Sequence, residues 1–497
     1  MIAPLFSICR NYRRIRQPAL ALSLFLVGCA LSAHAETFEY QNGETRSEAI
    51  VLSDANNELI VDSGTATQAG AISVQPGGDE IFLYKEGDGG LIFSAPVTIP
   101  VDNYFSIHGG SATFTAAGSL IDYLTIDNSS GGVAVARVTG SGTVENGTTY
   151  IANDGEGRLE VVGGGFFDAY STNMGYAATA SASILVSGAT SLFRTEYLEM
   201  GDGGQAEITL NEGGRLTFTS ESDLIYLGTQ ETSHGTLNLG NASGETAAAA
   251  AGILDATGLE GRTGGGTLVF NHSQDDYALT RDGTEGGDAV LLSGNIALRV
   301  EHGTTVLTGA NTHTGDTTVT GGTLRLSDVG ASASVLGTGG LEIEAGGNVE
   351  GNGTVLGDAT VAGRLAPGES IGQLNFDGDL TLESTAVAVM EIGSLSGFDV
   401  INVREAFTFG GTLEIAFTDG FTPEPGASFD LFTFGSRSGD FSQILFELPD
   451  YSGTLSYNGG VATLTIATIP EPSAEALLIS LLAGAALFAR RRSYSRQ

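Results

Sequence analysis

Acidic side chains are the groups in this sequence that could most readily carry chemistry. There are 58 Asp and Glu against 21 Lys and Arg, and the formal net charge is −37. Asp154 and Asp202 follow equivalent positions of a recurring pattern, so they could align on one face as an acid–base pair. Basic partners are scarce, because eight arginines stand at the two ends of the chain and Lys85 is the only lysine between them. We therefore interpret both aspartates as solvated turn residues and expect no catalytic site.

Histidines and glycine-rich turns could hold a metal or a phosphate. Gly201–Gly204 lacks the Lys-Ser/Thr pair and the helix of a phosphate-binding loop. No EF-hand loop or G-G-x-G-x-D repeat is present, so we expect no metal and no cofactor, although calcium at an acidic turn stays open. The acidic surface also disfavours nucleic acid as a partner. We expect the scattered histidines to be surface or turn residues: His108, His234, His272, His302 and His313.

A repeating β-structure must position these residues. Between Tyr150 and about Gly240, a turn and a strand with alternating apolar residues recur every 23 to 27 residues. With abundant glycine turns, this period predicts an all-β fold, a right-handed parallel β-helix of ~25-residue coils. Equivalent positions are Ile151, Met174, Met200 and Leu227. The predicted inward ladder is Leu159, Ile184, Ile208 and Leu237.

The first 35 residues have the features of a secretory signal peptide. A basic region ends at Arg16, an apolar run follows, and Ala33-His34-Ala35 precedes Glu36 as a cleavage site. We expect the mature chain to begin at Glu36. Residues 26–29, Leu-Val-Gly-Cys, resemble a lipobox, so lipidation at Cys29 stays open. The two cysteines both lie in this segment, so the mature chain would contain no thiol.

The C-terminus has three features in a fixed order: Pro470-Glu471-Pro472, an apolar run over residues 476–489, and Arg490-Arg491-Arg492. As a helix the run would reach ~21 Å, short of the ~30 Å hydrocarbon core, which suits a transient anchor. The arginines would stay cytoplasmic. This arrangement resembles the PEP-CTERM sorting signal. The resemblance implies that an exosortase-type enzyme removes the tail. It also implies delivery to the outer surface or extracellular matrix of a Gram-negative bacterium that makes extracellular polysaccharide.

A second resemblance lies in the body of the chain. Residues 306–315 read V-L-T-G-A-N-T-H-T-G, and residues 321–324 read G-G-T-L. They resemble the autotransporter-associated β-strand repeat, with His313 in place of the usual tyrosine. Residues 365–372 and 378–382 resemble the last coils of autotransporter passengers, and residues 410–415 and 425–429 extend that likeness. Only about 30 residues follow Ala467, too few for the membrane barrel of such proteins, so the likeness concerns structure and not the export route.

These patterns predict an organisation and a function. The expected segments are a signal peptide (1–35), an irregular N-terminal β region or cap (36–149), β-helix repeats (150–300) with a disturbed stretch at 241–288, passenger-like coils (301–469) and the sorting tail (470–497). We expect an exported structural or adhesive surface protein, not an enzyme, whose partners are the secretion translocon, the exosortase-type enzyme, and extracellular polysaccharide or neighbouring cells. Binding would use Thr, Asn and aromatic side chains repeated on exposed faces. Two alternatives stay open, a polysaccharide-degrading β-helix enzyme and a lipid-anchored envelope scaffold.

Overall fold

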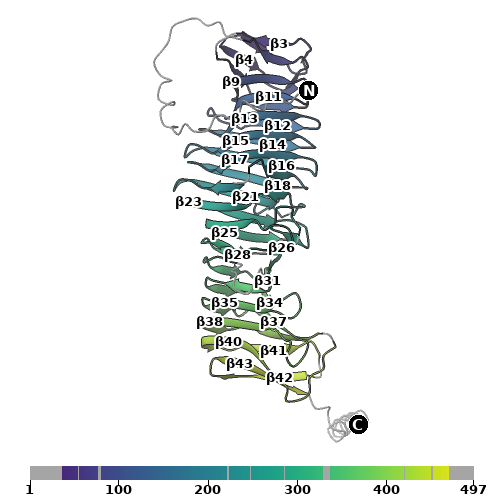
Figure 1. Ribbon diagram of the computed structural model, residues 1–497, viewed down its shortest axis with the longest axis vertical. Coiled ribbons are helices and arrows are strands. Elements are labelled where there is room, and N and C mark those ends of the chain that lie inside the picture. The colour runs from purple at the N-terminus through teal and green to yellow at the C-terminus, as the bar shows by residue number, and fades with distance from the viewer. Residues whose placement is uncertain are drawn as a thin grey trace, which may run out of the picture.

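The chain forms an elongated β-solenoid, in which the first strands lie at one end of the long axis and the last described strands lie at the other (Figure 1). The computed structural model describes residues 36–468, except 54, 77–79, 221–222, 247, 285, 328–335, 419 and 449–450. The described part contains strands and no helix, and nearly all strand pairs are parallel. The expectation of an all-β parallel solenoid is therefore confirmed.

Most strands belong to one large sheet that winds around the long axis. Its strands are β1 (Glu36–Glu39), β2 (Thr45–Arg46), β3 (Ile50–Leu52), β4 (Asn56–Ile60), β5 (Thr65–Gln68), β6 (Ile72–Val74), β7 (Phe82–Glu86), β8 (Gly90–Phe93), β9 (Val97–Ile107), β10 (Ser111–Phe114), β11 (Ser119–Ile126), β12 (Ala134–Thr139), β13 (Thr143–Ile151), β14 (Glu156–Val162), β15 (Phe166–Met174), β16 (Ser181–Ser187), β17 (Leu192–Met200), β18 (Gln205–Asn211), β19 (Arg215–Phe218), β20 (Leu224–Leu227), β21 (His234–Gly240), β22 (Ile253–Asp255), β23 (Gly258–Asn271), β25 (Leu291–His302), β27 (Thr312–His313), β28 (Thr317–Val319), β30 (Leu341–Ile343), β32 (Gly353–Val355), β33 (Ala359–Val361), β35 (Gln373–Phe376), β36 (Leu380–Leu382), β38 (Val400–Phe409), β40 (Ser428–Gly439), β42 (Tyr451–Asn458) and β43 (Val461–Thr468). The second sheet consists of β24 (Tyr277–Ala278), β26 (Thr304–Leu307), β29 (Thr323–Leu326), β31 (Asn348–Gly351), β34 (Arg364–Pro367), β37 (Val387–Ile392), β39 (Thr412–Phe417) and β41 (Gln443–Phe446).

The strand pairs form three parallel ladders, one on each side of the coil. The first ladder runs through β1, β4, β7, β9, β11, β13, β15, β17, β20, β23 and β25. The second runs through β2, β5, β8, β10, β12, β14, β16, β18 and β21. The third runs through β3, β6, β9, β11, β13, β15, β17, β19 and β22. Long strands such as β13 turn a corner and serve two ladders, so each coil meets its neighbours on all three sides.

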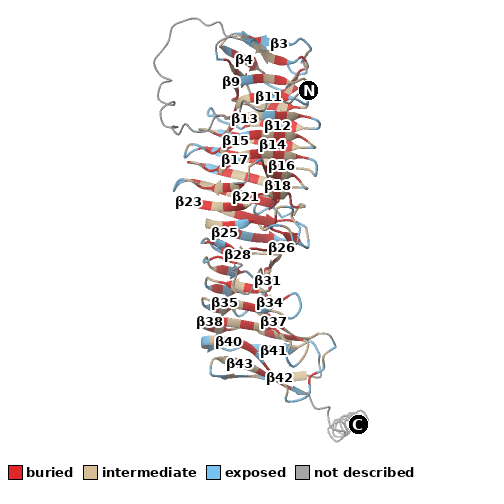
Figure 2. Cartoon of the chain, viewed as in Figure 1, coloured by how far each residue is buried: buried red, intermediate tan, exposed pale blue. Residues whose placement is uncertain are grey.

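Buried apolar residues form a continuous core inside the solenoid. Figure 2 shows buried segments, in red, in the coils along its length. Leu159 pairs with Ile184, Ile184 with Ile208, and Ile208 with Leu237, and each is at most 1% exposed. Because side chains alternate across a strand, the residues between them point outward. The predicted inward ladder is therefore confirmed. The four equivalent positions also align, since Ile151 pairs with Met174, Met174 with Met200, and Met200 with Leu227.

The N-terminal region differs from the expectation. Residues 36–149 are not an irregular cap, because β1 to β13 already join the same three parallel ladders. The coils here differ in length: Phe82 pairs with Tyr104, but Tyr104 pairs with Tyr123, a shorter step along the chain. Because the number of residues per coil varies here, no fixed repeat length is visible in the sequence, although the strands stack in parallel as they do elsewhere.

The stretch expected to be disturbed contains both regular and irregular structure. β23 takes part in the first two ladders without interruption apart from register shifts. The third ladder changes here, since β22 ends one series and β24 begins the second sheet. The excursion between β21 and β22 is held by Glu301, whose carboxylate accepts hydrogen bonds from Ser243 Oγ (2.6 Å) and the Gly244 amide (2.8 Å).

The C-terminal end of the described chain is closed by an antiparallel hairpin. β43 pairs antiparallel with β40 on one side and β42 on the other. Aromatic rings fill the space beneath it: Phe409 lies 3.9 Å from Phe407, 5.7 Å from Phe432 and 5.4 Å from Tyr457, measured between ring centroids. A reversed strand ends the parallel ladder and covers the last coil, which would otherwise expose backbone edges and apolar surface.

Candidate binding surface

Most residues of the two terminal signals lie outside the described residues. These are Ala33, Ala35, Cys29, Pro470, Glu471, Pro472, Arg490, Arg491 and Arg492. Glu36 is the first described residue and begins β1. Within residues 36–468, as far as they are described, no helix is long and apolar enough to cross a membrane.

The residues singled out for acid–base or metal chemistry are not assembled into a site. Asp154 is exposed, and Asp202 Oδ1 accepts a hydrogen bond from Gln230 Nε2 at 3.2 Å. No group of three or more metal-ligating side chains occurs among the described residues. The histidine prediction was partly wrong, because His272 and His313 are buried. His272 Nε2 lies 2.9 Å from Thr305 Oγ1 and its Nδ1 accepts from the Gln274 amide, which suits a neutral ring in the core.

The outward side of the first ladder carries aromatic rings in register. Phe82 pairs with Tyr104, and Tyr104 with Tyr123. Their ring centroids are 4.8 Å and 4.6 Å apart, with interplanar angles of 8° and 17°. These distances match the ~4.8 Å spacing of neighbouring strands, so the coil stacking itself sets the ring stacking. Parallel rings at these distances must be offset, which leaves part of each ring uncovered.

Further tyrosines continue this surface toward the middle of the solenoid. Tyr170 and Tyr197 are 51% and 54% exposed and meet edge to face at 5.7 Å. Tyr176, 47% exposed, follows the end of β15. We call the whole set the tyrosine face: Phe82, Tyr84, Tyr104, Tyr123, Tyr150, Tyr170, Tyr176, Tyr197 and Tyr226. Leu124 and Ile126, which alternate with outward residues in β11, are fully buried, so the rings rest on a rigid core.

Carboxylates flank the tyrosine face. Burial, followed by the negative charge of nearby Glu80, raises the pKa of the Tyr104 hydroxyl to about 12. Burial and the charge of Asp122 raise the pKa of Tyr123. Burial and the charge of Glu196 raise the pKa of Tyr170. The hydroxyls of Tyr104, Tyr123 and Tyr170 therefore stay protonated near neutral pH, and the carboxylates beside them give this surface a negative charge.

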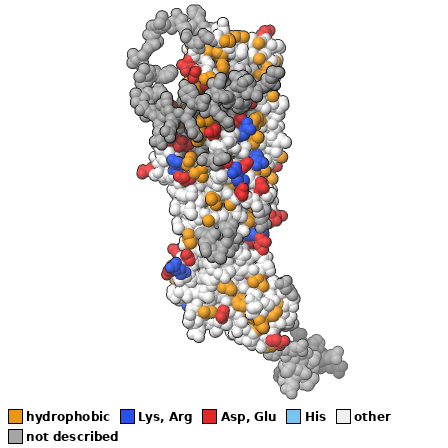
Figure 3. All heavy atoms as spheres, in the orientation of Figure 1, with side chains coloured by type: hydrophobic (Ala, Val, Ile, Leu, Met, Phe, Trp, Pro, Cys, Tyr) orange, Lys and Arg blue, Asp and Glu red, His pale blue; other side chains and the backbone are white. Residues whose placement is uncertain are grey.

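Positive charge is largely neutralised on the described surface. Each described arginine lies within 4.0 Å of a carboxylate. On the view in Figure 3, the blue side chains accordingly lie beside red ones. Arg262, which lies 3.9 Å above the Tyr226 ring, is 3.8 Å from Glu260. Lys85 is buried, and its Nζ donates to the carbonyls of Gly87, Gly89 and Gly109. Nothing in this arrangement favours an anionic ligand.

A pocket of about 320 Å³ lies in the second half of the solenoid, beside Arg325 and Asp399. The Arg325 guanidinium is 2.8 Å from Glu350 and 3.2 Å from Glu369. Burial raises the pKa of the Asp399 carboxyl to about 7, which is the range of a general acid. Its two oxygens, however, accept from the amides of Gly372 and Glu391, both at 2.7 Å, so Asp399 already holds two backbone segments.

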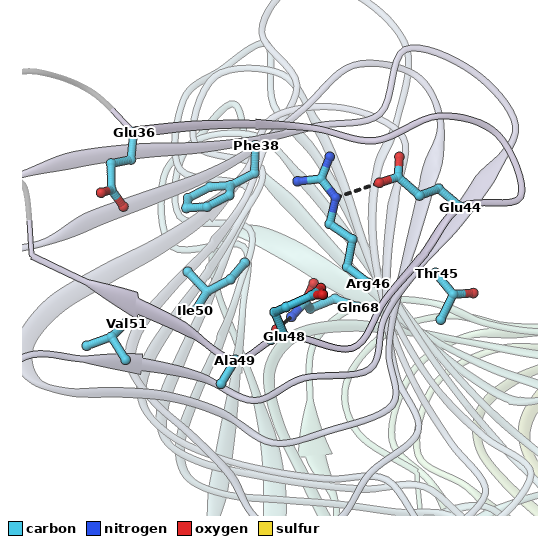
Figure 4. Close-up of a pocket in the computed structure, with 10 residues that line it drawn as sticks. All are labelled: Glu36, Phe38, Glu44, Thr45, Arg46, Glu48, Ala49, Ile50, Val51 and Gln68. Carbon is cyan, nitrogen blue, oxygen red and sulfur yellow. Dashed lines mark hydrogen bonds and ion pairs between the residues drawn. The ribbon is translucent and has the colours of Figure 1, made fainter.

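A second hollow, of about 550 Å³, lies at the N-terminal end of the solenoid. Figure 4 shows Phe38, Ile50 and Val51 on one side of it and the ion pair of Arg46 with Glu44 on the other. Within the described residues, β1, β2 and β3 each pair with a strand on one side only. This hollow therefore lies at the first described coil of the core, and two of the charged groups in its lining, Arg46 and Glu44, are already paired with each other.

The comparisons with known proteins agree with the passenger-like part of the sequence. A family model described as passenger-associated-transport-repeat matches residues 302–326. Asn311 in this repeat is buried and ties two coils together, since its Oδ1 accepts from the Leu292 amide at 3.0 Å. The resemblance to autotransporter passenger repeats is thus confirmed for this segment. It indicates a surface or secreted protein.

One curated relative is described as "Uncharacterized lipoprotein YdeK", from Escherichia coli (strain K12). It is 33% identical over 198 residues, which are 38% of this chain and 14% of the relative. The chain therefore spans only a small part of the length of that protein.

Sequence reasoning anticipated aromatic side chains on exposed faces but did not locate them. The available signal was the recurrence of tyrosine about once per coil, at 104, 123, 150, 176, 197 and 226. Uneven coil lengths hid their alignment.

Proposed function

We propose that this protein is an exported structural and adhesive β-helix of the outer cell surface or extracellular matrix. It holds the tyrosine face on a rigid, elongated body and contacts extracellular polysaccharide or neighbouring cells through it. The proposal includes right-handed coils of about 25 residues. The observation that carries it is the row of aromatic rings from successive coils: Phe82, Tyr104 and Tyr123 stack in register and are partly exposed, and the exposed Tyr170 and Tyr197 meet edge to face farther along. An array of weak contacts on one rigid surface gains avidity.

The proposed export route uses both ends of the chain. The secretion translocon exports the chain, and cleavage before Glu36 releases the N-terminus. The short apolar run over residues 476–489 anchors the chain transiently, and an exosortase-type enzyme recognises Pro470-Glu471-Pro472 and removes the tail. The passenger repeat at residues 302–326 supports a surface or secreted destination.

Cosedimentation of the full exported chain with insoluble extracellular polysaccharide tests the function. The variant Tyr170→Ala/Tyr197→Ala should lose most of the binding, because it removes two half-exposed rings. Leu395→Ala is the matched control, since Leu395 is 68% exposed and lies away from the tyrosine face. Equal binding by both variants, or none by the parent, would contradict the proposed function.

A lipid-anchored envelope scaffold is the second candidate. The relative described as a lipoprotein and the lipobox-like residues ending at Cys29 favour it. Intact mass of the mature protein separates the two candidates, because a diacylated Cys29 and a free Glu36 terminus differ in mass and in cell fraction.

The enzyme alternative is tested at the Arg325 pocket. Turnover of a polysaccharide by the pure protein, abolished by Asp399→Asn, would replace the adhesive function with a degradative one. We propose that the protein binds glycans without changing them.

A further inference from the structure

The tyrosine face combines two features that together define a class of ligand. Flat aromatic rings give the apolar faces of sugar rings a surface to stack on, and tyrosine hydroxyls add hydrogen bonds at the rim. Asp122 directly precedes Tyr123 in β11, and both side chains are partly exposed. Glu196 directly precedes Tyr197 in β17, again with both side chains at least partly exposed. Glu80 lies near Tyr104, whose pKa is raised first by burial and then by the charge of Glu80. Aromatic rings favour a ligand with pyranose rings, and the neighbouring carboxylates favour a ligand with positive charge. A ligand that has both features fits this surface best.

The charge of the protein indicates whether the polysaccharide is anionic or cationic. The chain has a net charge of −37, and the described arginines are paired with carboxylates. An anionic polymer would meet uncompensated repulsion along this surface. A cation above an aromatic ring is also attracted by the ring face. A cationic polymer therefore gains from the carboxylates and from the rings together.

The shape of the surface suits a linear chain. From Phe82 to Tyr197 the first ladder takes five steps between neighbouring coils, about 24 Å along the axis at the usual strand spacing. Thr148 and Ser171 fill the row between Tyr123 and Tyr197 and are small enough to let a chain pass. The tyrosine face is thus long and narrow, and its aromatic rings and neighbouring carboxylates are distributed along its length.

We propose that the tyrosine face binds a linear polysaccharide of amino sugars whose amino groups are free and protonated. This inference rests on the proposed function and names its ligand class. The sugar faces lie against Tyr170 and Tyr197, and the ammonium groups lie near Glu80, Asp122 and Glu196.

The test compares two oligosaccharides with one backbone. The probes are soluble glucosamine oligomers and the corresponding N-acetylglucosamine oligomers, titrated into the full exported protein at low and high salt. The charge variant is Glu80→Gln/Asp122→Asn/Glu196→Gln, which keeps the rings. Asn at 122 keeps an acceptor for the Asp102 amide, which now donates to Asp122 Oδ2 at 2.8 Å. The ring variant is Tyr170→Ala/Tyr197→Ala. Glu342→Gln, an exposed carboxylate on β30, is the control.

We expect the free-amine oligomer to bind at least ~10-fold more tightly than the acetylated one, and the charge variant to remove that preference. Added salt should weaken free-amine binding, and the ring variant should weaken both oligomers. Equal binding of both oligomers, unchanged in the charge variant, would overturn the inference and leave the proposed function intact. Loss of the preference in Glu342→Gln would also overturn the inference, because general attraction to an acidic protein would then explain the result. Full binding by the ring variant would overturn both the inference and the proposed function, since both place the ligand on Tyr170 and Tyr197. Binding of neither oligomer nor any other glycan by the parent would overturn both.

Discussion

Replacing Ile208 with aspartate tests the coil register at its centre. Ile208 lies in β18 between Ile184 of one neighbouring coil and Leu237 of the other, and it is fully buried. Its neighbours in sequence, Glu207 and Thr209, point outward and hydrogen-bond with Asn238 on the next coil. The substitution therefore puts a carboxyl group where the column of apolar side chains is continuous.

The expected cost follows from two terms. Loss of the apolar side chain, judged from Ile-to-Ala changes in cores, costs about 2 to 5 kcal/mol. A buried polar group without a partner adds about 1 to 3 kcal/mol. Together they lower the free energy of unfolding by about 3 to 8 kcal/mol, a large part of the roughly 5 to 15 kcal/mol of a typical domain. The new carboxyl would have a raised pKa in the folded state. The destabilisation is therefore smallest below the unfolded pKa and grows as the pH rises through the folded pKa.

Urea unfolding followed by far-ultraviolet circular dichroism, at pH 4 and pH 7, measures this cost. Ile208→Val should cost only about 0.5 to 1.5 kcal/mol, because the shape is nearly kept. Asp202→Asn is the surface control and should change stability by no more than ~0.5 kcal/mol. If Ile208→Asp unfolds at the urea midpoint of the parent, the assigned register is wrong.

Three further predictions concern buried polar groups and the chain ends. Burial lowers the pKa of both His272 and His313 to about 4. The stability that these neutral rings contribute is therefore present above about pH 6.5 and is lost as the pH falls toward 4. In thermal melts, His313→Tyr should reduce the decrease in melting temperature between pH 6.5 and pH 4. Lys85→Met should cost several kcal/mol, since three turn carbonyls lose their donor, whereas Glu86→Gln at the adjacent outward position should melt close to the parent. Alanines at residues 470–472 should retain the protein in the inner membrane, and cell fractionation with an unchanged surface yield would argue against recognition of the tripeptide.

The parts of the fold that the sequence revealed are those in which coil length is nearly constant. Between Ile151 and Leu237 the alternation of apolar residues and the turn positions recur together, so the inward column was predicted residue by residue. In the first coils the steps vary, and the parallel pairing of Phe82 with Tyr104 depends on contacts between distant segments. The burial of His272 and His313 was missed for a related reason. A neutral imidazole fits the core when its nitrogens find partners, and for His272 the partner Thr305 comes from the next coil.

The sequence predicted that exposed faces would carry aromatic side chains, but it did not predict which of them would become neighbours. Each strand shows which residues alternate, but the alignment of Tyr104 with Tyr123, or of Ser171 with Tyr197, is set by how many residues each corner takes. Corners in this protein use unusual backbone conformations, such as Asp102 with a φ of 66°. Such local geometry is fixed by the packing of neighbouring coils, and it decides which outward residues become neighbours.

Deleting one complete coil tests how much that coil contributes to glycan binding while the rest of the solenoid stays folded. Met174 pairs with Met200, so deletion of residues 174–199 joins Asn173 to Met200 and puts Met200-Gly201 where Met174-Gly175 stood. The inward column stays continuous, and the tyrosine face loses Tyr176 and Tyr197. We expect a folded protein with weaker glycan attachment and a circular dichroism spectrum like that of the parent. Deletion of residues 174–198 is the control. It brings Glu199 to the inward position of Met174 and reverses the alternation beyond it, which should abolish folding of the following coils. If both deletions fold equally well, stacking does not depend on the register described here. If the in-register deletion keeps full attachment, the rings of this coil do not contact the ligand.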